Sequence, residues 1–90
     1  MKTTLKVHPQ DDLIVALQDL KKGQEIHFEG HNYVLQDDIP AKHKFVTRDF
    51  AVGESIKMYG VVVGKAIIPI KKGGLIHTEN LKHASEDYSI

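Results

Sequence analysis

One pattern of apolar and polar positions recurs along the chain: an apolar residue, two variable positions, a glycine, two more positions and a second apolar residue. A glycine fixed in this way predicts a tight turn, because glycine adopts positive φ without strain. The flanking apolar residues are expected to close over a core. A fourth copy, at 39–45, carries Lys42 in place of the glycine, so its backbone must accept strain or turn differently. The regular copies occupy residues 20–26, 50–56 and 70–76.

The spacing of these copies predicts an internal duplication. Leu20 and Phe50 are 30 positions apart, and Ile39 and Ile70 are 31 apart. We therefore expect two related halves that differ by one inserted residue, each folded as a hairpin. Such periods are also typical of solenoids, but two copies are too few to bury a solenoid core. The two halves are residues 14–45 and 45–76.

The segments between the turns are short and favour β-strands. Residues 13–17 form a dense apolar run, but Asp11 and Asp12 could instead N-cap a helix over residues 13–20. The β-branched Ile14 and Val15, together with the shortness of the run, favour a strand instead.

Two hairpins are predicted further along the chain. Residues 25–28 and 33–36 flank a polar tip at 29–32. Residues 61–68 are strongly β-prone, and Gly64 within them indicates a bulge or a close backbone approach. Many short strands separated by glycine turns predict an all-β domain with two pseudo-symmetric halves.

Only a few short helical turns are expected, and they fall at equivalent places in the two halves. These are residues 47–50 and 78–81. From Asn80 the chain is polar, so we expect fraying there; the domain extends to about residue 85, and residues 86–90 form a tail or linker.

Size and composition narrow the function. Ninety residues make one domain, too small to wall a large catalytic cleft, so a binding face or half of a site is expected. The 12 Lys+Arg balance the 12 Asp+Glu, which argues against a nucleic-acid partner. There is no cysteine for a disulfide or thiolate site. No apolar run resembles a signal peptide or a membrane span, so we expect a cytoplasmic protein without membrane contact.

The histidines are the conspicuous reactive groups, and most have an ordinary surface explanation. No pair has the spacing of a zinc-peptidase helix, and no serine stands in a nucleophile elbow. We expect His27, His31 and His83 to be solvated.

His43 and Lys44 stand out because they follow the one turn that lost its glycine. Imidazole and ammonium together suit an anionic, hydroxylated ligand, although a charged turn in water explains them equally well. Tyr59 and Gly60 could place a phenol beside an open backbone N–H that binds a ligand. The alternative is that Tyr59 packs in the core and has a structural role only.

Several ordered motifs resemble the N-terminal domain of the altronate/galactarate dehydratase family, over about residues 5–85. That domain belongs to the SAF group, which shares the β-clip fold with type III antifreeze proteins. Lys42, Asp12, Met58 and Pro69 depart from the family pattern. The family positions that this chain keeps are His8, Asp11, His43, Lys44, Tyr59, Gly60, Gly64, Ala66, Gly73, His77 and Asn80.

The resemblance implies an all-β fold of the β-clip, antifreeze-like type and a part in dehydrating a sugar acid to a 2-keto-3-deoxy acid. Iron(II) or another divalent metal would act in the complete enzyme, with none bound by this domain alone; its ligands are unknown. His43 and Lys44 would be catalytic, and His8, Tyr59, Gly60 and His77 would contact substrate.

A large catalytic domain or subunit is the implied partner, and a homo-oligomer is possible. The alternatives are a stand-alone SAF carbohydrate-binding or assembly module, and the small subunit of a related hydroxy-acid or sulfo-acid lyase.

Overall fold

The computed structural model describes residues 3–76 and 81–83, and within these residues the chain forms strands, bridges and turns without a helix. The predicted all-β fold is confirmed, including a strand rather than a helix at β2. The strands are β1 (Thr4–Leu5), β2 (Leu13–Ala16), β3 (Glu25–Phe28), β4 (His31–Val34), β5 (Lys44–Val46), β6 (Ser55–Met58), β7 (Val61–Ala66), β8 (Leu75–Ile76) and β9 (Leu81–His83).

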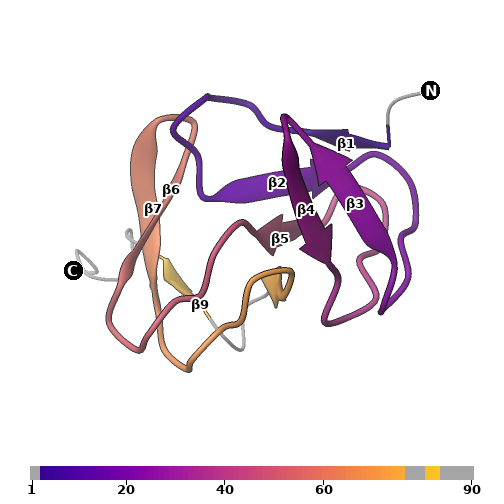
Figure 1. The fold of residues 1–90 in the computed structure, drawn as a ribbon. Helices are drawn as coiled ribbons and strands as arrows, with labels where there is room; N and C mark the ends of the chain where they lie inside the picture. The colour runs from indigo at the N-terminus through magenta and orange to yellow at the C-terminus, as the bar shows by residue number, and fades with distance from the viewer. Residues whose placement is uncertain (1–2, 77–80, 84–90) are drawn as a thin grey trace.

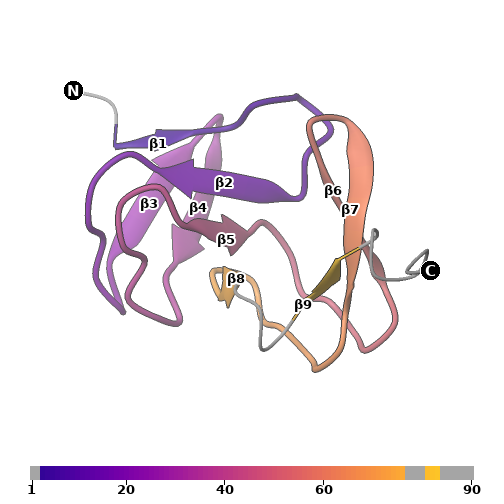
Figure 2. The same ribbon diagram turned by 180° about the vertical axis from the view of Figure 1, so that it is seen from behind.

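A central antiparallel sheet joins the two halves. Its strand order is β1-β2-β5-β8, while β3–β4 forms a separate hairpin and β6-β7-β9 a three-stranded sheet. The β3–β4 and β6–β7 hairpins lie at opposite ends of the molecule, on either side of the central strands (Figure 1, Figure 2).

The central sheet is buried on both faces, which explains the unbroken apolar run in β2. Side chains alternate between faces along a strand. Accordingly, Leu13 packs in one core cluster with Ile56 and Phe50 of the second half. Its neighbour Ile14 packs in another cluster with Ile26 of the first half. A strand covered on both sides has no polar face to alternate with.

Equivalent hydrogen bonds in the two halves confirm the duplication. Leu20 and Ile39 exchange backbone hydrogen bonds of 2.8 and 2.9 Å, as Phe50 and Ile70 do at 2.7 and 2.9 Å.

The residue that makes the second half longer is a β-bulge in β7. Ile56 pairs with Gly64 but the next residue, Lys57, pairs with Val62, so Val63 is left over. The offset of 30 therefore becomes 31 at this point, and the bulge predicted at Gly64 is confirmed.

Lys42 accepts the strained backbone of its turn. Its φ is +73°, beside +84° for Gly23, +89° for Gly53 and +88° for Gly73 in the equivalent turns.

Three predicted details are wrong. The tip of the first hairpin is a two-residue turn, with Glu29 at φ +49° and Gly30 at φ +81°, so residues 31–32 already belong to β4. Residues 47–50 form a bend leading to the Phe50 bridge, because Phe50 is held extended by its partner Ile70. The expected fraying from residue 80 is replaced at 81–83 by β9, which pairs with β7. Residues 78–80 of the second predicted helical turn and the tail at 86–90 lie outside the described residues.

Candidate functional site

The β1–β2 loop meets the tip of the β6–β7 hairpin, and a buried carboxylate joins them. The backbone N–H of His8 donates to Asp11 Oδ2 at 3.0 Å, and that of Gly60 donates to Oδ1 at 2.9 Å. Asp11 is only 3% exposed, and the two backbone hydrogen bonds satisfy both of its buried carboxylate oxygens. The arrangement fixes His8 next to Gly60. The family resemblance implies that both residues contact substrate but does not predict that they are neighbours.

The imidazole of His8 lies directly against Gly60. A Cβ at position 60 would come within 3.1 Å of ring atoms Cδ2 and Nε2, and Gly60 also has a φ of +75°. The Nδ1 atom of His8 accepts a hydrogen bond from the backbone N–H of Gln10 at 3.1 Å, so the neutral ring carries its proton on Nε2. A donor N–H is thus presented beside the hairpin tip.

Tyr59 and Gly60 differ from both sequence interpretations. The N–H of Gly60 is bonded to Asp11 rather than open. Tyr59 is 60% exposed and does not pack in the core. Its φ of +58° places it at the tip of a two-residue turn with left-handed backbone at both positions, where a side chain projects from the hairpin.

His43 and Lys44 lie at the start of β5. His43 is exposed, with Nδ1 3.4 Å from the carbonyl oxygen of Ala41. Lys44 is half-buried and stands opposite Val15 and Ile76 in the neighbouring strands. Within residues 3–76, Lys44 has no ion-pair partner. Its ammonium group is therefore available to pair with an anion that approaches this end of β5.

The two groups of candidate residues are not brought together. Lys44 pairs with Val15 near the end of β2, whereas the Asp11 cluster precedes Leu13 at its start. Asp11 lies four residues before Val15, and four extended residues span about 13 Å, so the two groups are separated along the sheet. The expected surface positions of His27 and His31 are confirmed, since both are exposed. His77 and the side chain of His83 lie outside the described part of the chain.

Sequence reasoning missed the roles of Asp11, Asp12 and Arg48. Asp11 and Asp12 were considered as caps of a helix, but Asp12 Oδ2 accepts from the backbone N–H of Lys57 at 2.8 Å. The Arg48 guanidinium lies 3.9 Å from the Phe50 ring centroid and 3.1 Å from Glu54 Oε2. The available signal for Asp11 was its place among the positions that resemble the family.

Metal ligands do not gather in the described residues. No three His, Asp or Glu side chains there are close enough to hold one ion. The donor set within residues 3–76 therefore does not fit the divalent metal that the resemblance implies.

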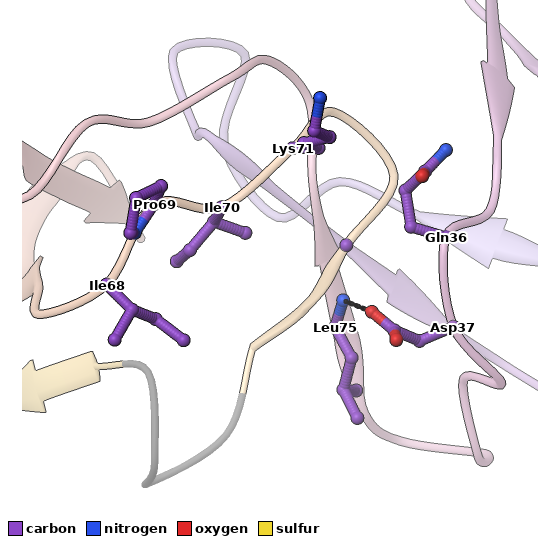
Figure 3. A pocket seen from close by; sticks show the side chains of 8 residues that line it. Gln36, Asp37, Ile68, Pro69, Ile70, Lys71 and Leu75 are labelled. Carbon is purple, nitrogen blue, oxygen red and sulfur yellow. Dashed lines mark hydrogen bonds between the residues drawn. The ribbon is translucent and has the colours of Figure 1, made fainter.

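A shallow pocket of about 260 Å³ lies between the two equivalent turns after β4 and β7. Figure 3 shows Ile68 and Pro69 on one side and Gln36 and Asp37 on the other. Asp37 Oδ2 accepts from the backbone N–H of Leu75 at 3.0 Å, which ties the walls together.

The fold, with its duplicated hairpins and ordered motifs, defines a β-clip domain of the SAF type. The chain belongs to the altronate/galactarate dehydratase SAF domain family, whose model matches residues 2–84. No helix in the described residues is long and apolar enough to cross a membrane.

The chain is similar in sequence to two altronate dehydratases and to one subunit of a sulfo-lyase. The chain is 34% identical over 90 residues to an altronate dehydratase from Bacillus subtilis, covering 100% of the chain and 18% of that enzyme. It is 33% identical over 78 residues to one from Escherichia coli, covering 87% and 16%. The (2R)-sulfolactate sulfo-lyase subunit alpha of Chromohalobacter salexigens is 28% identical over 90 residues, covering 91% of the chain and 96% of that subunit. The chain thus spans less than a fifth of the altronate dehydratases.

Proposed function

We propose that the chain is the accessory part of a cytoplasmic sugar-acid dehydratase and completes an active site carried mainly by a larger domain or subunit. The observation that carries this proposal is the match of the whole chain to 18% of an altronate dehydratase. A small domain whose apolar residues form two small cores is suited to adding groups to a partner's site.

The chemistry that this chain can supply lies at His43 and Lys44. Lys44 is a half-buried residue whose positive charge has no ion-pair partner among the described residues, which suits a sugar-acid carboxylate. His43 offers an exposed imidazole, the side chain that most often serves as a general acid or base in catalysis. The dehydration would remove the proton on the carbon next to the carboxylate and the hydroxyl group on the following carbon, which together make one water. The resulting enol would then tautomerise to the 2-keto-3-deoxy acid. The proton needs a positioned base, and iron(II) or another divalent metal would be held by the larger part.

A second candidate is the small subunit of a lyase that acts on a sulfonated hydroxy acid. The observation that favours it is length, since the chain covers 96% of the sulfolactate sulfo-lyase subunit alpha. A sulfonate and a carboxylate are both anions, so Lys44 serves either substrate.

Co-purification with the larger part, followed by initial rates on altronate, galactarate and (2R)-sulfolactate, tests the proposal. Turnover of altronate or galactarate supports the dehydratase, and turnover of sulfolactate alone supports the lyase subunit. A chain that binds a carbohydrate without any larger partner would instead be a stand-alone binding module.

A further inference from the structure

The two halves of the molecule share a backbone but differ in surface chemistry. Between Phe50 and Ile70, six large apolar side chains are exposed by 44–61%. In the equivalent stretch from Leu20 to Ile39 there is one, Val34. We call the six residues the apolar face: Val52, Tyr59, Val61, Val62, Ile67 and Ile68.

The first half is an internal control for what the fold itself requires. Counterparts are found by subtracting 30 before the bulge in β7 and 31 after it. All six counterparts are polar or charged, so the hairpin and its turns form equally well with hydrophilic surfaces. They are Lys22, Glu29, His31, Asn32, Gln36 and Asp37. Apolar surface concentrated in this way indicates an interaction site.

The same half has also lost a turn-stabilising hydrogen bond. In the first half, Asp38 Oδ1 accepts from the backbone N–H of Lys22 at 2.9 Å. The counterparts are Pro69 and Val52, and proline has no side-chain acceptor. Within the described residues nothing accepts from the Val52 N–H. An apolar residue next to Ile68 thus replaces a cap that the fold could have kept.

The apolar face follows the β6–β7 hairpin, from its tip to the turns at its base. This hairpin lies at the end of the molecule away from β3–β4 (Figure 1, Figure 2). The last described strand, β9, pairs with β7 through Gly64 and His83. The described part of the chain therefore ends beside this hairpin. The pocket of about 260 Å³ lies next to Ile68 and Pro69 at the base of this hairpin (Figure 3).

We infer that the apolar face is where the larger catalytic part of the enzyme docks, through a complementary apolar surface. This inference rests on the proposed function, since it requires such a part to exist. The relatives support this occupant: altronate dehydratases are more than five times as long as the match, and in the sulfo-lyase the equivalent chain is named a subunit. A subunit must hold its partner by surface contacts alone, and exposed apolar residues supply them.

Exchanging residues for their own counterparts gives matched variants. In one, Ile67→Gln and Ile68→Asp install the first-half residues; in the control, Val34→Lys installs the residue found at position 65. Each is titrated against the larger part of the enzyme, purified as a separate polypeptide, and melted alone. The double variant should bind at least about ten-fold more weakly without a lower Tm, because interface energy is concentrated in few apolar anchors. The control should bind within about two-fold of the unchanged chain.

The outcomes separate the two claims. If the unchanged chain binds and the double variant binds equally well, the docking inference is overturned while the proposed function stands. If the unchanged chain self-associates and the double variant abolishes this, the face belongs to a second copy and the inference also fails. If the unchanged chain neither binds the larger part nor supports its turnover, the proposed function itself fails.

Discussion

At position 42, a lysine holds the left-handed backbone that glycine holds in three equivalent turns. The φ of Lys42 is +73°, and a residue with a Cβ pays about 1–2 kcal/mol for this conformation. Strain of this kind is found where the surrounding structure over-determines the backbone, and often near functional residues. The next two residues are the candidate pair His43 and Lys44.

Lys42→Gly should therefore stabilise the chain by about 0.5–1 kcal/mol, measured as the free energy of unfolding in denaturant. Gly53→Lys is the matched reverse change, at a φ of +89° with open space around the Cβ position, and should destabilise by about the same amount or more. A Lys42→Gly chain less stable than the original would show that the side chain, rather than the backbone, dominates at this turn.

His43→Ala and Lys44→Ala should reduce the turnover of the assembled enzyme far more than they reduce this domain's stability. Replacing an exposed turn residue usually changes stability within about 0.5 kcal/mol, whereas losing a positioned acid or base costs about 10²–10⁴-fold in rate. Lys44→Met is the control that keeps the packing beside Val15 and removes the charge. Near-normal rates in both alanine variants would show that His43 and Lys44 are not catalytic and would move the search to His8, Tyr59, His77 or the larger part.

At the scale of elements, four similar turns hold two hairpins against the central sheet, and their surroundings differ. Gly53 and Gly73 have almost the same φ, +89° and +88°. A Cβ at Gly53 would meet open space, whereas one at Gly73 would overlap the carbonyl oxygen of Val34. Gly73 is the point where the second half's turn packs on the first half's hairpin.

Gly53→Ala and Gly73→Ala should consequently differ in cost. The first should lose about 1 kcal/mol for left-handed backbone alone, and the second several kcal/mol, since a buried backbone clash must also be relieved. Equilibrium unfolding of both variants measures the difference. Equal losses would mean that the two turns have equivalent surroundings in solution.

The turn at Ala51 also predicts a dependence on pH. The backbone hydrogen bond from Ala51, at 2.7 Å, and the hydrogen bond from Arg48 lower the pKa of Glu54 from its ordinary value of 4.5. Because the folded pKa is the lower one, the carboxylate stabilises the fold above pH 4.5, and this contribution disappears as the pH falls through the folded pKa.

Glu54→Gln should thus lower Tm at pH 7, with a difference that shrinks below pH 4.5. Glutamine can still accept from Ala51, as Gln24 does from Lys21 at 3.0 Å in the first half, so the charge is the main loss. Melts at several pH values measure this difference. A constant difference from pH 7 to pH 3 would exclude ionisation as its origin.

Features that depend on residues close together in the sequence could be predicted, whereas contacts between residues far apart in the sequence could not. The β2 strand, the duplication and the bulge at Gly64 were predictable because they depend on local β-propensity and on the spacing of the repeats. The approach of Gly60 to Asp11 joins residues 49 positions apart, from a loop outside both repeats. No periodicity reports such a contact. A core-packing position was one of the two interpretations of Tyr59, but the two-residue turn directs it outward.

At the scale of the whole molecule, one sheet carries a small core on each face and each hairpin closes one of them. The exposed surfaces of the two hairpins differ: Val34 is the one exposed large apolar residue between Leu20 and Ile39, whereas the six residues of the apolar face lie between Phe50 and Ile70. The docking of a larger part that we infer would use this difference.

The most direct measurement is the initial rate with altronate and with galactarate, in the presence of iron(II), for the purified chain, for the larger part, and for the two combined. The account predicts background rates for the 90-residue chain alone and full turnover only for the combination. Turnover well above background by the chain alone, or an equal rate from the larger part without it, would contradict the account.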